Sequence, residues 1–337
     1  REHDLVIGTF GRAAWVMDDI RPLRAIANNP EITSKQSYLF DPPHAILAEY
    51  QQPTGSRFGG DALFNAENRK AGSMLTYFYK AQNENEKDSL TLKIYDGDRQ
   101  IRTLKRKVPK KTGFYRWYWF MNEKGVDRPS RSAQKRKSEP GGVTVKPGTY
   151  KVVLESKEAT SETEVTVITD PRIEISQKAI EERYTYAKLI EGYIEKTTAA
   201  VNQLKASKKT LDFYKNKIEQ KDKDTFKELL ETIAEHSKKI EMLLDGFIGK
   251  EDKRQGIVRN PDSSVIRRIS NASRYIGSRP FGITSTEEKL LEHVHNDLKT
   301  ALEKTNAFYE KNWENLKAKI EEVALSEFKP IQRFEIE

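Results

Sequence analysis

The sequence of 337 residues predicts a multidomain protein in which a β-rich region precedes a helical region. Between residues 55 and 171, short stretches alternate apolar and polar side chains and are separated by turn residues, as in strands with one buried face. From residue 172 onward, apolar side chains recur every three or four positions, the period of an amphipathic helix. We therefore expect a β-sandwich over 55–171 and an antiparallel helical bundle over 172–327.

The region before the sandwich, residues 1–54, begins with two short strands that have no evident partner strands. The stretch DLVIGTFGRAAWVMDDI (4–20) contains these strands, joined by a Gly-Arg turn. A short helix should follow over 20–29, with Asp19 as its cap and Pro22 in its first turn. A further strand pair is expected within SYLFDPPHAILAEY (37–50). The rest of the sheet to which 4–20 belongs is not evident from the sequence.

The strands expected in the β-rich region have the number and spacing of an immunoglobulin- or fibronectin-type sandwich. Alternate residues from Leu90 to Ile94 should face one way, and those from Tyr150 to Leu154 should meet them across the core. The turn 96–98, Asp-Gly-Asp, marks a hairpin. The expected strands cover 73–81, 89–105 (divided by this turn), 113–121, 147–156 and 163–170.

The helical region should contain one very long helix and three others. Apolar residues from Ile180 to Ile218 keep their spacing without a proline, which predicts a helix of roughly 60 Å at about 1.5 Å per residue. Ser285 and Glu288 form a capping box that opens the last helix. The residues 328–337 alternate again and are expected to return to the sandwich as a strand. The three other helices are expected over 226–246, 262–276 (with Gly277 as its stop) and 285–323.

Composition restricts the classes of function. The chain has no cysteine, which excludes disulfides and thiolate chemistry, and no apolar run long enough to span a membrane. The net charge of +8 is concentrated in residues 101–150, where 14 Lys and Arg face 3 Asp and Glu. We interpret the basic stretches 102–111 and 131–140 as solvated loop and edge-strand residues. An anionic partner, such as a polysaccharide or a membrane surface, is the alternative, and no nucleic-acid partner is expected.

Several stretches together resemble a known family. DLVIGTFGRAAWVMDDI resembles the closing blade of bacterial sortilin-type β-propeller exoproteins, also described as BNR-repeat or glycosyl-hydrolase-like proteins. GFYRWYWFM (113–121), KPGTYKVVL (146–154) and DPRIEIS (170–176) resemble the family's later segments in the same order. The stretch 59–80 resembles the family's entry into its sandwich, with arginine and lysine where two prolines are usual; the matching positions are Asn65, Glu67, Asn68, Gly72 and Tyr77.

The resemblance implies that residues 1–54 are the remnant of a last propeller blade and its connector. The upstream propeller of the same protein would then be a partner of this chain. The resemblance also implies an exported protein of a Bacteroidetes-like bacterium, located in the periplasm, on the outer membrane or outside the cell, with its leader upstream. It supplies no catalytic pair, because the hydrolase label comes from the propeller.

The histidines and the paired aspartates of this chain do not have the arrangement of a metal site or a catalytic site. His293 and His295 lie two positions apart, so on a helix they point in different directions and do not share one metal ion. Asp18 and Asp19 are adjacent, which is poor geometry for the two carboxylates of a glycosidase, and we expect them in a turn and a helix cap. No phosphate-binding loop, nucleophile elbow or zinc motif is present. We assign no catalytic residue, metal or cofactor.

The aromatic strand 113–121 offers the one candidate ligand site. Alternation places Tyr115, Trp117 and Trp119 on one face, and one of the two faces must fill the core. These three residues are the candidate binding residues for a sugar, if their face is exposed. The alternative is that both faces are covered.

The sequence therefore predicts a non-catalytic structural and interaction region of a secreted sortilin-type propeller protein. Two alternatives remain. In the first, the chain is an accessory region of a glycoside hydrolase whose active site lies in the propeller. In the second, it is a carbohydrate-binding module. A protein or polysaccharide partner and oligomerisation through the helical bundle are compatible with each.

Overall fold

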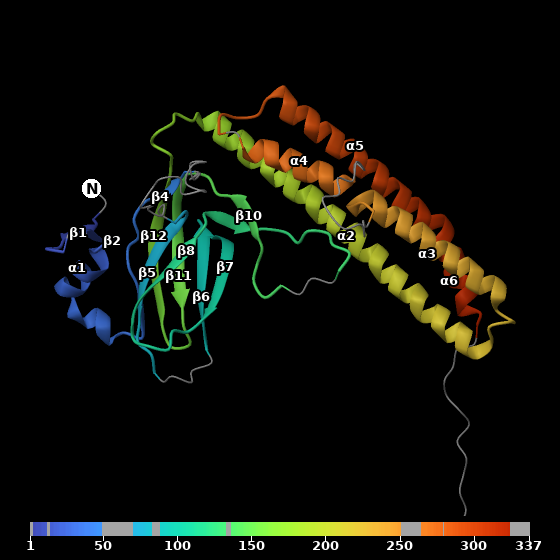
Figure 1. Cartoon of the computed structure of the whole chain (residues 1–337), viewed down its shortest axis with the longest axis horizontal. Coiled ribbons are helices and arrows are strands. Elements are labelled where there is room, and N and C mark those ends of the chain that lie inside the picture. The colour runs from blue at the N-terminus through green and yellow to red at the C-terminus, as the bar shows by residue number, and fades with distance from the viewer. Residues whose placement is uncertain are drawn as a thin grey trace, which may run out of the picture. The chain divides into compact units, whose positions relative to one another are not determined.

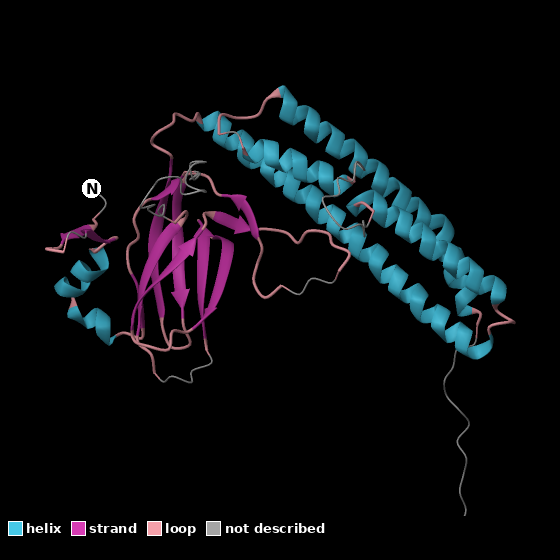
Figure 2. Ribbon diagram, in the orientation of Figure 1, coloured by secondary structure: helices cyan, strands magenta, loops and turns pink. Residues whose placement is uncertain are grey.

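The computed structural model describes residues 3–11, 14–48, 70–82, 88–132, 136–250, 264–278 and 280–323. It divides into two compact units. The first, the sheet unit, comprises Arg1–Val126, Arg136–Thr185 and Pro280–Gly282. The second, the helical unit, comprises Asp127–Lys135, Tyr186–Arg279 and Ile283–Glu337. Figures 1 and 2 show the strands in the first and the long helices in the second, so the predicted mixture of β and α structure is confirmed.

The sheet unit contains two main sheets. The larger has five strands in the order β4-β12-β11-β6-β7, all antiparallel to their neighbours except β4, which is parallel to β12. Their bounds are Ala45–Leu47 (β4), Ser89–Asp96 (β6), Arg99–Lys107 (β7), Gly148–Glu155 (β11) and Thr160–Thr169 (β12). The smaller sheet has the order β3-β5-β8, with bounds Ser37–Leu39, Ser73–Tyr79 and Gly113–Trp119.

Two small antiparallel strand pairs complete the strands in the described part of the chain. The first pairs β1 (Leu5–Gly8) with β2 (Ala14–Met17), as the sequence predicts for residues 4–20. The second pairs β9 (Asn122–Lys124) with β10 (Gly141–Thr144), two strands that the sequence does not predict because both are short and carry little apolar alternation. The strands expected within 37–50 also exist, but they belong to different sheets instead of pairing with each other.

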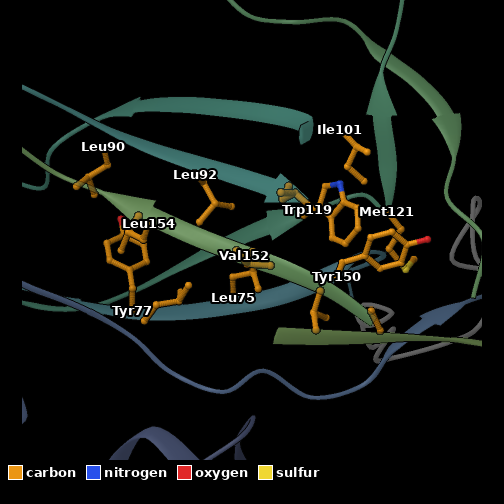
Figure 3. Packing of buried hydrophobic residues seen from close by; sticks show 14 of the residues in the cluster. Leu75, Tyr77, Leu90, Leu92, Ile101, Trp119, Met121, Tyr150, Val152 and Leu154 are labelled. Carbon is orange, nitrogen blue, oxygen red and sulfur yellow. The ribbon is translucent and has the colours of Figure 1, made fainter. Parts of the chain in front are cut away.

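One hydrophobic cluster receives side chains from both main sheets (Figure 3). The expectation that residues of the 89–105 and 147–156 strands meet across the core is wrong. Strands β6 and β11 are neighbours in one sheet, with Ile94 opposite Val152 and Leu92 opposite Leu154, so the two sets lie side by side and point the same way. From the smaller sheet, the cluster takes residues including Leu75, Tyr77, Tyr79 and Trp119.

The outer faces of the two sheets differ. The five-stranded sheet carries ion pairs on its outer face, in which Lys93 lies 2.7 Å from Glu155 and Lys151 lies 2.7 Å from Glu162. The three-stranded sheet instead packs a second apolar cluster on its outer face, which includes Phe78. Side chains of helix α1 (Arg21–Asn28) and of the short η1 turn (Pro30–Ser34) complete that cluster, so the segment after the first hairpin covers this sheet.

The predicted helices are present. Their bounds are Gln177–Asp222 (α2), Lys227–Ile248 (α3), Val265–Gly277 (α4), Ser285–Phe308 (α5) and Glu314–Glu321 (α6), with a π-helical turn, η3 (Tyr309–Trp313), between the last two. Helix α5 begins with a capping box formed by Thr284 and Glu287, one residue earlier than expected, because Thr284 supplies the capping hydroxyl. Helix α3 contacts α4, α5 and α6, and α4 also packs on α5.

Some sequence predictions lie outside the described residues. These are the strand expected over 328–337 and the family-like positions Asn65, Glu67 and Asn68. In the described part of the chain, no helix is long and apolar enough to cross a membrane.

Candidate functional site

The aromatic strand β8 turns its predicted binding face toward the core. Trp119 is fully buried, its ring meets Tyr150 edge-on at 5.4 Å, and its indole Nε1 donates to the carbonyl of Asn122 at 2.9 Å. Tyr115 and Trp117 are partly buried and pack against the same hydrophobic cluster. The prediction of an exposed sugar platform on these three residues is therefore wrong, because their face is the one that fills the core.

The opposite face of β8 points outward. Phe114 on this face is 43% exposed, and Phe120, next to the strand, is 65% exposed. Alternation defines two faces of a strand but does not say which one is buried. Pairing with β5, whose Leu75 and Tyr77 point into the core opposite Trp117 and Tyr115, decides it.

Arg106 covers the free edge of β8. Among the described strands, β7 and β8 lie at the edges of their sheets. Arg106 on β7 donates from Nη1 to the carbonyl of Arg116 at 3.2 Å, and its guanidinium lies 4.7 Å from the ring of Trp117 and 5.8 Å from that of Tyr77. Burial raises the pKa of Tyr77 to about 12, although the nearby guanidinium acts in the opposite direction. A basic residue of the 102–111 stretch therefore has a structural role.

Replacing Arg106 with methionine should destabilise the protein by about 1–2 kcal/mol, because the cation–π contacts and the hydrogen bond to the strand edge are lost while an apolar stem remains. Urea unfolding measures this change, and light scattering reports whether the uncovered edge promotes association. The control is Lys105→Met, at the exposed neighbouring position. An equal effect of both substitutions would contradict the role given to Arg106.

One acidic and one basic side chain, Glu123 and Arg102, are buried near β9. Glu123 accepts hydrogen bonds from Arg99 at 2.9 and 3.2 Å and from the hydroxyl of Tyr184 at 2.7 Å. Arg102 is buried and donates to the carbonyls of Glu123, Glu139 and Pro140. Both arginines thus stabilise the chain around β9. Arg102 is buried, whereas the sequence predicted solvated side chains for the stretch 102–111; Arg99 lies outside that stretch and is exposed.

The hairpin β1–β2 is the most unusual surface of the sheet unit. Leu5 and Ile7 face the same side as Met17 and Trp15, their partners in the register, and Val6 and Val16 face the other side. All six are exposed, with Val6 at 64% and Trp15 at 66%. Among the described strands, β1 and β2 pair only with each other. The hairpin therefore presents two apolar faces and two unpaired edges.

The base of this hairpin is anchored by the Asp18–Asp19 pair. Asp19 is buried, has a φ of +50°, and binds Arg21 through both carboxylate oxygens, at 2.6 and 3.0 Å. It also accepts from the N–H of Arg21 at 3.3 Å, close to its predicted capping role, although the N-cap residue is Ile20. Arg116 of β8 donates to the carbonyl of Asp18. Both aspartates thus have structural partners.

The histidines do not gather into a site. His295 lies 3.3 Å from the hydroxyl of Tyr193 through Nδ1, and His293 is exposed. His236 is buried on α3, with its ring nitrogens near the carbonyls of Thr232 and Asn312. Within the described ranges, no group of three His, Asp or Glu side chains is arranged to hold a metal ion.

Comparisons with known proteins do not assign the chain to a family. No protein-family model and no characterised protein match the sequence. A solved structure, pT26-6p, is similar to 74% of this chain, with 13% sequence identity and a TM-score of 0.17. The match spans 46% of pT26-6p, which is less than half of its length. A TM-score this low implies neither a shared fold nor a shared function.

Proposed function

We propose that this chain is a non-catalytic structural and interaction region of an exported sortilin-type propeller protein, and that its first hairpin completes the last propeller blade. The observation that carries this proposal is the exposure of apolar side chains on both faces of β1–β2. The family resemblance of residues 4–20 motivates the choice of a propeller as the partner.

An isolated two-stranded hairpin is barely stable in water, and it gains stability from further strands or from a packed face. A sheet with one buried face normally alternates apolar and polar residues, whereas a sheet covered on both faces is apolar on both. A blade of a propeller has a neighbouring blade on each side. The apolar residues Val6 and Val16 on one face and Ile7 and Trp15 on the other fit such a position.

A finer architecture belongs to the same proposal. We take the two main sheets, with their shared hydrophobic cluster, as a fibronectin-type sandwich over 55–171 to which the preceding segment adds the edge strands β3 and β4. We take the helices as an antiparallel bundle over 172–327, supported by the contacts of α3 with α4, α5 and α6. The sandwich and the bundle would then serve as a scaffold that follows the propeller.

Hydrogen exchange tests the proposal by comparing this chain with a longer natural protein that includes the sequence upstream. In this chain, amides of β1 and β2 should exchange rapidly, since only one strand pair protects them. In the longer protein, we expect at least about a hundredfold slower exchange, because the hairpin gains partner strands and two covered faces. Amides of β11, already in the middle of its sheet, provide the control and should not change.

Equally rapid exchange of the hairpin in both proteins would contradict the proposal. So would an upstream sequence without repeated blades, because the hairpin would then have no sheet of the required kind to join. Glycan hydrolysis by this chain alone would contradict its non-catalytic role.

A further inference from the structure

The chain makes an excursion between β9 and β10 that is closed at its base. The N–H of Gly125 donates to the carbonyl of Pro140 at 3.0 Å. A Cβ added at Gly142 would lie 2.7 Å from backbone atoms of Gly125, so the backbone segments at the two ends of this excursion are in contact. Residues 127–132 of this excursion belong to the helical unit, and we call them the strap.

Helix α2 holds the backbone of the strap. The hydroxyl of Thr198 donates to the carbonyl of Asp127 at 2.7 Å. The ammonium of Lys205 donates to the carbonyls of Ser130 and Ser132 at 2.9 and 3.2 Å. All three of these hydrogen bonds go to backbone carbonyls of the strap.

Arg131 attaches the strap to helix α3. Its guanidinium contacts the carboxylates of Glu241, at 3.3 Å, and Asp245, and it donates to the carbonyl of Gly249 at 2.7 Å. Lys208 on α2 binds the other oxygen of Glu241. This hydrogen bond from Lys208, with the charge of Arg131, holds the pKa of Glu241 below its usual range, so the carboxylate stays ionised at neutral pH.

The contacts described for the strap are polar, and they include a hydrogen bond from Arg128 to the hydroxyl of Ser270 on α4 at 3.3 Å. None of residues 127–132 is buried. Arg131, Glu241 and Asp245 all keep partial contact with solvent. Ion pairs in such positions are weak individually and are screened by salt, whose Debye length falls to about 3 Å at 1 M. The helical unit has its own buried apolar residues, among them Leu204, Ile233 and Leu244.

We propose that residues 127–132 form a detachable strap, held on helices α2 and α3 by an ionic latch of Arg131 with Glu241 and Asp245. Opening this latch by salt or by loss of the two carboxylates releases the strap and exposes Lys205, Glu241 and Asp245, while the helices remain folded. This inference is independent of the proposed role of the hairpin, because it involves only the helical unit.

A spin label provides the test in the full chain. The chain has no cysteine, so Ser132→Cys introduces a single attachment site at an exposed position of the strap. In this protein the label should be immobilised, and in the latch variant Glu241→Gln/Asp245→Asn it should become mobile. The matched control is Glu231→Gln/Glu235→Gln, two exposed positions on the same helix, which should leave the label immobilised. Addition of 1 M NaCl should have the same effect as the latch variant.

Trypsin gives a second readout at the peptide bond after Arg131. Cleavage follows the population of the open strap, so we expect about a tenfold higher rate in the latch variant than in the control. Circular dichroism should show unchanged helix content in both. A label that is equally mobile, or equally immobilised, in the latch variant and the control would overturn the latch. Loss of helix content in the latch variant would overturn the claim that the strap is detachable.

Discussion

Replacement of Trp119 with alanine should destabilise the sheet unit by about 3–5 kcal/mol, the usual cost of removing a large buried aromatic side chain. Trp119 is fully buried, it packs edge-on against Tyr150, and its indole bonds the carbonyl of Asn122. The substitution leaves a cavity in the cluster shared by the two sheets and an unpaired carbonyl at the start of β9. Urea unfolding followed by tyrosine fluorescence and far-ultraviolet circular dichroism measures the loss.

Phe120→Ala is the matched control, because it removes an aromatic ring from the next position in the chain. Phe120 is 65% exposed, so its removal should change the free energy of unfolding by less than about 0.5 kcal/mol. If Phe120→Ala were as damaging as Trp119→Ala, the burial of the two faces of β8 would have to be reversed. The pair thus tests which side of the aromatic strand forms the core.

Gly142→Ala should cost about 3 kcal/mol or separate β9 from β10, because the added methyl group has no space. Its Cβ would lie 2.7 Å from backbone atoms of Gly125 and Lys124, and backbone cannot move aside as a flexible side chain can. Loss of the β9–β10 contact would also disturb Glu123, which Arg99 and Tyr184 hold in place. Thermal unfolding and amide exchange of residues 122–124 measure the effect.

The control for this substitution is Gly148→Ala on β11. There the nearest atoms to an added Cβ are the Cε2 and the hydroxyl oxygen of Tyr150, 3.8 and 3.9 Å away, which are ordinary contact distances. We expect a change within about 0.5 kcal/mol, since alanine also restricts the unfolded chain. A tolerated alanine at 142 with normal exchange of β9 would show that the two strands do not cross as closely as described.

Most secondary structure was predictable because it follows from periodicity. The long helix α2 appears where apolar residues repeat from Ile180 to Ile218, and the hairpin β6–β7 turns at Asp96-Gly97-Asp98. The neighbours of each strand were not predictable in this way. Leu92 and Leu154 both alternate correctly, but nothing local in the sequence says that their strands are adjacent in one sheet and not opposed across the core.

The buried face of the candidate site was likewise not predictable from the local sequence. The aromatic alternation of β8 was evident, but the choice of its buried face depends on pairing with β5, which is a long-range contact. The basic stretches looked solvated because charge patterns do not reveal which arginine finds a partner distant in the chain. Arg131 meets Glu241 and Asp245 more than a hundred positions later. The glycines at 125, 141 and 142 were the one local signal that two segments of the backbone approach each other closely near the strap.

The strap also has a consequence for how the polypeptide is made. The helical unit is assembled from Asp127–Lys135, Tyr186–Arg279 and Ile283–Glu337, with strands of the other unit encoded in between. During synthesis the strap leaves the ribosome before α2 and α3 exist, so it must wait, unattached, while β10, β11 and β12 are translated. Truncation at one position cannot yield both units intact: a fragment that ends before α2 keeps a strap without its helices, and one that begins with α2 has the helices without their strap.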